Sequence, residues 1–138
     1  MTQPITHGSH HIGLTVPRLE DSAAFFTDLL GWQVAGRDDA YPAIFVTDSK
    51  IMVTLWQAQT DNFTPFDKDN VIGLHHLALQ VDSAQALDAL YHQLKNAKNV
   101  SIEFAPELLR NGPAHHMMCY EPGGIRIEFI WPGIPTTN

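Results

Sequence analysis

The sequence is poor in positive charge. It has eight lysines and arginines against fifteen aspartates and glutamates, a formal net charge of −7, and no run of basic residues. Binding of nucleic acid or of an anionic membrane surface normally requires a basic patch or stripe. We therefore expect neither of them as a partner.

Long apolar runs and cysteine pairs are also missing. No stretch reaches the 18 apolar residues of a membrane span, and no basic segment followed by an apolar one opens the chain. Cys119 has no second cysteine to pair with, which suits a reducing compartment, so we expect a cytoplasmic protein. Charged residues make up only 17% of the chain, below the typical figure of about 25%, and this favours a homodimer with a covered surface.

A repeated heptapeptide is the strongest pattern that the sequence contains. HHIGLTV at residues 10–16 returns as HHLALQV at residues 75–81. Each copy alternates apolar and other residues with the period of a strand and is followed by a helical pattern. The chain of 138 residues is thus interpreted as a single domain, 1–138, with one module at about 9–57, a polar linker at about 58–70 and a second module at about 71–132.

The two modules predict an α+β fold. Each is expected to run strand, helix and three further strands, so that two βαβββ modules form an open, curved mixed sheet around a central cleft. The first helix should end at Gly31, and Asp82 with Gln85 forms a candidate capping box for the second. Strands are expected at residues 10–16, 32–36, 43–47, 51–57, 75–81, 100–104, 114–120 and 125–131.

The alternation separates the two histidines of each pair. His10 and His75 are predicted to face the core, whereas His11 and His76 are predicted to face the cleft. In the last strand, IRIEFIW, the same alternation turns Glu128 and Arg126 to the cleft side. Alignment of the hairpin turns TDSK and EPGG places Thr54 in the first module where Glu128 stands in the second.

These positions predict a metal site. Two imidazoles and one carboxylate, from His11, His76 and Glu128, form a facial triad that leaves coordination positions open for substrate or water. Such a donor set suits one divalent ion of Fe, Mn, Ni or Zn, and the spacing does not distinguish these metals.

Other side chains are candidates around that site. A four-residue turn pairing Tyr120 with Ile125 would put His115 and Met117 on the face of Glu128, which makes His115 a candidate for an acid-base or supporting role. Arg126 would supply positive charge to the same side. Apolar and neutral cleft candidates that could line a substrate pocket, or pack at a dimer interface, are Met52, Thr54, Trp56 and Met117.

The paired modules resemble the vicinal oxygen chelate superfamily. The likeness covers about residues 9–132 and is strongest in HIGLTV, HLALQV and the turn-strand segment EPGGIRIEF. The superfamily contains glyoxalase I, extradiol dioxygenases, fosfomycin-resistance thiol transferases and bleomycin-binding proteins. The resemblance implies metal ligation by His11, His76 and Glu128, with Glu128 also catalytic, and a small oxygenated substrate chelated to the metal.

One departure from the resemblance bears on the reaction. Glyoxalase I usually has a fourth ligand, Glu or Gln, where this chain has Thr54. Because of the small size of the chain, a glyoxalase-like lyase or isomerase is our first prediction of its function. An extradiol-type dioxygenase, a fosfomycin-type thiol transferase and a metal-free small-ligand binding protein are the alternatives.

Overall fold

A computed structural model describes residues 2–134, and the chain divides into two compact units, Met1–Phe63 and Thr64–Asn138. The boundary falls inside the segment predicted to be a linker. No helix among the described residues is long and apolar enough to cross a membrane. That both modules form one domain around a central cleft stays a prediction.

The first unit is a four-stranded mixed sheet with one helical segment. Its strands run in the order β1-β4-β3-β2, with β1 parallel to β4 and the other neighbours antiparallel. Its elements are β1 (His11–Val16), α1 (Leu19–Ala24), a π-helical turn (Phe25–Leu29), β2 (Gln33–Asp38), β3 (Ala43–Thr47) and β4 (Met52–Gln57).

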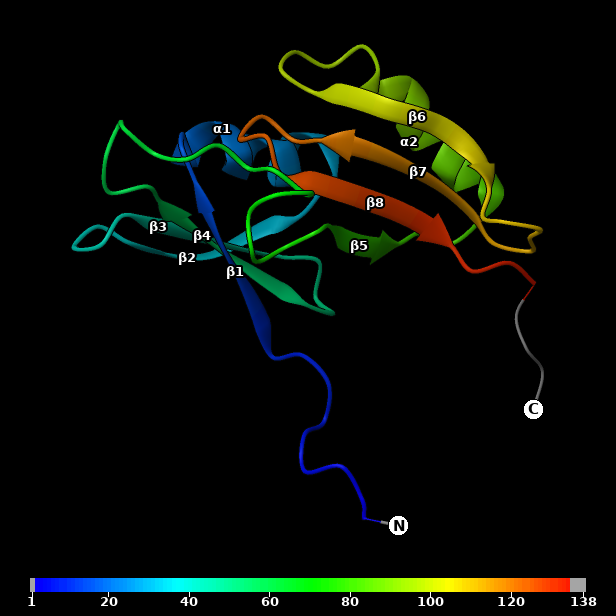
Figure 1. Ribbon diagram of the computed structural model, residues 1–138, viewed down its shortest axis with the longest axis horizontal. Coiled ribbons are helices and arrows are strands. Elements are labelled where there is room, and N and C mark those ends of the chain that lie inside the picture. The colour runs from blue at the N-terminus through cyan, green and yellow to red at the C-terminus, as the bar shows by residue number, and fades with distance from the viewer. Residues whose placement is uncertain (1, 135–138) are drawn as a thin grey trace. The chain divides into compact units, whose positions relative to one another are not determined.

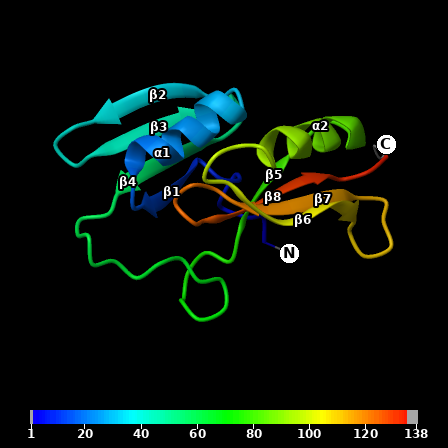
Figure 2. The same ribbon diagram turned by 90° about the horizontal axis from the view of Figure 1, so that it is seen from above.

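The second unit repeats this topology. Its strand order, β5-β8-β7-β6, is the same order one module later, again with one parallel and two antiparallel neighbours. Figures 1 and 2 show each sheet with its own helix. The elements are β5 (Leu77–Gln80), α2 (Ala84–Leu94), β6 (Ser101–Leu108), β7 (His115–Tyr120) and β8 (Arg126–Trp131). The predicted tandem βαβββ fold, with open mixed sheets, is therefore confirmed.

Each helix covers one face of its sheet and creates a small core there. The segment α1 packs on β3 and β4, and α2 packs on β6, β7 and β8. Alternate strand residues supply the apolar side of each core, and each fully buried aliphatic side chain contributes roughly 1.5–3 kcal/mol. Strand residues in the two cores include Leu14, Val46, Val53 and Leu55 in the first unit, and Leu79, Met117, Cys119, Ile127 and Phe129 in the second.

One of the two predicted helix ends is confirmed, and the other differs by one residue. Gly31 follows the first helical segment with φ at +73°, as expected for a glycine that ends a helix. The N-cap of α2 is Ser83 rather than Asp82, because Ser83 has extended backbone angles and its hydroxyl accepts a hydrogen bond from the Ala86 amide at 2.9 Å. The capping box predicted from Asp82 and Gln85 was one residue early.

The hairpin between β7 and β8 corrects the predicted register. Tyr120 pairs with Arg126 rather than with Ile125, because Glu121 still belongs to the ladder and donates from its amide to the Ile125 carbonyl at 3.0 Å. The connecting loop therefore has three residues, 122–124, and ends at Gly124 with φ at +90°. This is the usual geometry of a three-residue hairpin loop, and the one-residue difference exchanges the two faces of β7.

Candidate functional site

The site lies on the face of each sheet that its helix does not cover, which we call the open face. In the first unit Gly13 is the neighbour of Thr54 across β1 and β4, and in the second Ala78 is the neighbour of Glu128 across β5 and β8. His11 and His76 each stand two residues before these small residues. The register thus gives the same equivalence of Thr54 with Glu128 that the turn alignment predicted.

The outer histidines of the two pairs do not face the core. His10 and His75 lie outside the strands and are exposed, so their predicted core placement was wrong. Strand pairing begins at His11 in the first unit and at Leu77 in the second, and the alternation of a strand cannot be extended to residues that the ladder does not hold. His76 also precedes β5, and it is placed on the open face by its 3.4 Å contact with Glu128. Each instead contacts its neighbour: the two Nδ1 atoms are 2.9 Å apart in His10 and His11, and 2.8 Å apart in His75 and His76.

Glu128 is the centre of the second unit's open face. It is 8% exposed, and both carboxylate oxygens have an imidazole beside them. Oε2 is 2.6 Å from Nδ1 of His116, and Oε1 is 3.4 Å from Nε2 of His76. A buried carboxylate needs such partners, because an ionised group without them would be strongly disfavoured.

Two contacts lie behind the ring of His76. Its Nδ1 is 2.8 Å from Nδ1 of His75, and Nδ1 of His75 is 3.5 Å from Arg126 Nη1. These contacts hold the ring with Nε2 directed at Oε1 of Glu128. An imidazole nitrogen and a carboxylate oxygen are both common metal ligands.

Arg126 does not offer a free charge. Its Nε and Nη2 atoms donate to the two oxygens of Glu103 at 2.9 and 2.7 Å, and the Tyr120 hydroxyl donates to the same carboxylate at 2.7 Å. The Arg126 hydrogen bonds lower the pKa of Glu103 from 4.5 to about 2. The Glu103 carboxylate in turn raises the pKa values of Arg126 and Tyr120. Arg126 is thus paired with Glu103 and is not a free cation for an anionic ligand.

The open face of the first unit is neutral and aromatic. Thr54 is 5% exposed, and its hydroxyl accepts a hydrogen bond from the Trp56 indole at 2.9 Å. The Trp56 ring lies 5.1 Å from Tyr41 and 5.8 Å from Phe45, centroid to centroid. A Cβ atom at Gly13 would lie 3.2 Å from the Thr54 hydroxyl, which is a tight approach, so a side chain there would require this hydroxyl to move by a few tenths of an ångström.

The donor set of the second unit fits part of a metal site. Two ligands of one ion, each about 2.1 Å from it, lie about 3.0–3.4 Å apart, and Nε2 of His76 and Oε1 of Glu128 have that spacing. Within the described part of the chain, no three His, Cys, Asp or Glu side chains are placed to hold a metal ion. The second unit by itself therefore provides two donors, and His11 belongs to the other unit.

The corrected register changes which residue of β7 meets Glu128. His115 pairs with Trp131 and Met117 with Phe129, so both lie on the face opposite Glu128, and Met117 is buried in the core. Their predicted placement on the cleft side was wrong. The sequence-based prediction missed His116 for the same reason, and the signal that could have identified it is the length of the Pro122-Gly123-Gly124 loop.

The remaining predicted side chains lie where the alternation put them. Met52 and Trp56 share the open face of the first unit with His11 and Thr54, and both are half-buried. Cys119 is buried in the second core, and burial raises the pKa of its thiol to about 12, so it is not a reactive thiolate. None of these placements tests a role in binding or catalysis.

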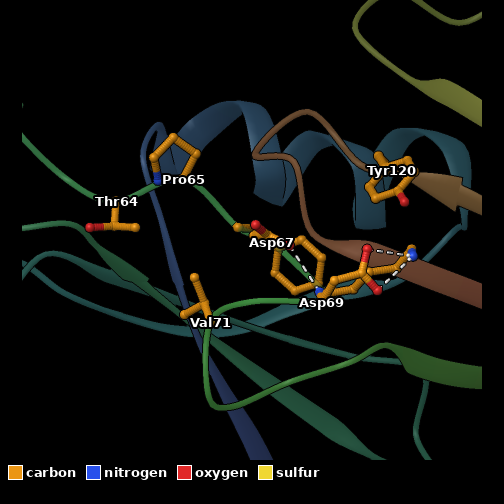
Figure 3. A pocket seen from close by; sticks show the side chains of 8 residues that line it. Thr64, Pro65, Asp67, Asp69, Val71 and Tyr120 are labelled. Atoms are coloured by element: carbon orange, nitrogen blue, oxygen red, sulfur yellow. Dashed lines mark hydrogen bonds and ion pairs between the residues drawn. The ribbon is translucent and has the colours of Figure 1, made fainter.

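A pocket of about 440 Å³ lies in the second unit beside Tyr120. Figure 3 shows Pro65, Asp67 and the Tyr120 phenol around it. Its charged groups are engaged locally: Lys68 pairs with Asp69 at 3.1 Å, and Asp67 accepts hydrogen bonds from the Asn70 side chain and from backbone amides of its own turn. These hydrogen bonds, first that of the Asn70 side chain, lower the pKa of Asp67.

Comparisons with known proteins agree on the family. Residues 8–129 match the model of the Glyoxalase/Bleomycin resistance protein/Dioxygenase superfamily. The mitochondrial methylmalonyl-CoA epimerase of Homo sapiens is 27% identical over 130 residues, which are 86% of this chain and 70% of that protein. The corresponding epimerase of Mus musculus is 25% identical over the same shares.

Solved structures with the same fold include proteins of several named activities. A glyoxylase/bleomycin resistance protein/dioxygenase domain from Frankia sp. EAN1pec superposes with a TM-score of 0.78, at 24% identity, over 92% of this chain and 98% of its own. A putative glyoxalase from Bacillus halodurans gives 0.74 at 26% identity, over 89% and 94%. A fosfomycin resistance protein from Listeria monocytogenes gives 0.71 at 16% identity, over 92% and 94%.

Proposed function

Since the chain belongs to the Glyoxalase/Bleomycin resistance protein/Dioxygenase superfamily, we propose that it is a metal-dependent enzyme of the glyoxalase-like lyase or isomerase type. In this proposal one divalent metal ion is held by His11, His76 and Glu128. The substrate is a small oxygenated compound that chelates the metal through its oxygens.

The observation that carries the proposal is the pair of atoms Nε2 of His76 and Oε1 of Glu128. Their separation is 3.4 Å, which is the spacing of two ligands of one metal ion. An imidazole nitrogen and a carboxylate oxygen placed in this way suit a divalent ion. The alternation that turns His11 to its own open face supports it as the third donor, supplied by the same chain or by a second copy in a homodimer.

The residues of this site would do three things. His76 and Glu128 hold the ion from one unit and His11 holds it from the other, leaving open positions for two substrate oxygens. A divalent ion bound there stabilises negative charge that develops on a substrate oxygen. Met52 and the half-buried ring of Trp56 supply an apolar wall beside the reacting group.

Proton transfer next to a carbonyl group is the reaction class that the relatives favour. The curated relatives are named as epimerases of a thioester, methylmalonyl-CoA, and inversion at a carbon beside a carbonyl requires removal and return of a proton. These names support an isomerase activity within the glyoxalase-like range as our proposal. The dioxygenase, thiol-transferase and metal-free binding alternatives have no contact among the described residues that favours them.

Exchange of substrate hydrogen with solvent tests the proposal directly. The metal-loaded protein is incubated in D₂O with methylmalonyl-CoA, with a glutathione hemithioacetal, with a catechol, and with fosfomycin plus thiol. The expected result is incorporation of deuterium at the carbon beside the thioester carbonyl of methylmalonyl-CoA, detected by NMR and lost in Glu128→Gln. Catechol and fosfomycin have no carbon beside a carbonyl, so product formation is measured for them instead. No exchange in any substrate, together with no metal retained or bound on titration, would instead favour the binding protein.

Glyoxalase turnover itself is expected to be weak or absent. Glyoxalase chemistry moves a proton between two neighbouring carbons, so it needs a base that reaches both of them, whereas epimerisation returns the proton to the same carbon. At the position where glyoxalase I usually has Glu or Gln, Thr54 offers a neutral hydroxyl that is already hydrogen-bonded to Trp56. The rate of hemithioacetal consumption by the metal-loaded protein measures this. Robust turnover would show that a residue other than Thr54 provides the base.

A further inference from the structure

His116 is buried on the open face of the second unit, and its ring is held from more than one side. It is 8% exposed, and its ring packs edge-on against Phe104 with centroids 5.0 Å apart. Nδ1 lies 2.6 Å from Oε2 of Glu128, while Nε2 lies 3.9 Å from Oε1 of Glu107. Both its position and its orientation are therefore determined by contacts.

The proposed metal site gives the hydrogen bond to Glu128 a direction. A carboxylate that ligates a metal ion is ionised and only accepts, so in that site the proton of the His116–Glu128 contact belongs to Nδ1 of His116. Hydrogen bonds to a charged group are shorter and stronger than neutral ones, and the separation of 2.6 Å agrees with this class. Oε2 is thereby occupied, and Oε1 is the atom left to face His76.

We propose that His116 is the positioning residue of the site: it holds Glu128 by Oε2, so that Oε1 is presented beside Nε2 of His76 as a single-oxygen metal ligand. This inference rests on the proposed function, because it concerns the same metal. Outer partners of this kind orient a ligand that would otherwise rotate, and their loss typically weakens metal binding by roughly 10–100-fold.

Three substitutions separate positioning from simple space filling. His116→Asn places an amide donor where Nδ1 stands, His116→Gln places it where Nε2 stands, and His116→Leu keeps the bulk against Phe104 without a donor. His115→Leu is the matched control, because His115 is the adjacent histidine on the opposite face. Thermal unfolding of each variant in a chelating buffer checks that it folds.

Isothermal titration with Mn²⁺ and Zn²⁺ is the measurement. We expect His116→Leu and His116→Gln to bind roughly 10–100-fold more weakly than wild type, and His116→Asn and His115→Leu to bind close to wild type. Equal affinity of wild type and His116→Leu, or failure of His116→Asn to restore binding, would overturn the inference and leave the proposed function standing. A wild type that binds neither ion overturns the proposed function.

A measurement on the wild type does not depend on the variants folding. In protein with ¹⁵N-labelled histidine and no added metal, NMR should show a proton on Nδ1 of His116. Its loss in Glu128→Leu would support the hydrogen bond as the cause. An Nδ1 of His116 without a proton in the wild type at neutral pH overturns the inference.

Discussion

Thr54 in the first unit and Glu128 in the second occupy equivalent positions. Thr54 is hydrogen-bonded to Trp56, whereas Glu128 is hydrogen-bonded to His116. The strand orders around these two residues are the same, and both lie beside a small residue on the first strand of their module. One open face is neutral and aromatic, while the other holds an arginine, imidazoles and the carboxylates of Glu103, Glu107 and Glu128. A duplicated module thus keeps its core and topology while its open face diverges.

In the proposed metal site the two units have different roles. The second unit would provide two of the three donors and the groups that contact them, whereas the first would provide His11 and an apolar wall. Substitutions at equivalent positions of the two units should therefore have very different effects.

The largest expected difference is between Glu128 and Thr54. Glu128→Gln removes the only carboxylate of the proposed triad, and we expect metal affinity to fall by more than the roughly 100-fold that the loss of an outer partner can cause. Thr54→Ala, at the equivalent position, should leave affinity unchanged because the Thr54 hydroxyl is already bonded to Trp56. Titration of both metal-free variants with Mn²⁺ measures this, and equal affinities would remove Glu128 from the site.

The next difference concerns the ion pairs of the two units. Glu103 has a pKa of about 2, below its ordinary value of 4.5, because of its hydrogen bonds with Arg126. A lowered folded-state pKa stabilises the protein above about pH 4.5, and this stabilisation is lost as the pH falls toward 2. Glu103→Gln should lower the free energy of unfolding by about 2–3 kcal/mol at pH 7, with the gap closing between pH 5 and 2.

Urea unfolding at pH 7, 4 and 2.5 measures that effect, with Glu20→Gln as the control. Glu20 pairs with Arg37 in the first unit at 3.0 Å, but both side chains are more than half exposed. Exposed pairs contribute little because water and salt screen them, so this variant should match wild type. If Glu103→Gln lowered the free energy of unfolding equally at all three pH values, the charge of the Glu103 carboxylate would not be the cause of the lost stability.

The smallest expected effect is at Trp56, on the open face of the first unit. Trp56→Phe retains a ring between Tyr41 and Phe45 but removes the donor to Thr54, which is expected to cost about 1 kcal/mol of unfolding free energy. Metal affinity should not change. Chemical unfolding and Mn²⁺ titration of this variant together check the comparison, and weakened metal binding would show that the aromatic face supports the metal site.

Much of the fold could be predicted from local patterns. The repeat of HHIGLTV as HHLALQV, the alternation in IRIEFIW and the glycine at residue 31 each act over a few residues. These local patterns correctly predicted the duplicated modules, most strand limits and the equivalence of Thr54 with Glu128. They also placed Glu128 on the open face, because period-two alternation depends only on the strand containing it.

The partners of Glu128 depend on pairing between strands, and only the tertiary structure decided them. Glu121 joins the ladder and leaves a three-residue loop, so His116 rather than His115 turns to the carboxylate. Arg126 meets Glu103 from β6 and His75 from outside β5, a contact that spans 51 positions in the chain. A register differing by one residue reverses a whole face of a strand, which is why the same sequence pattern predicted the carboxylate correctly and its histidine partner incorrectly.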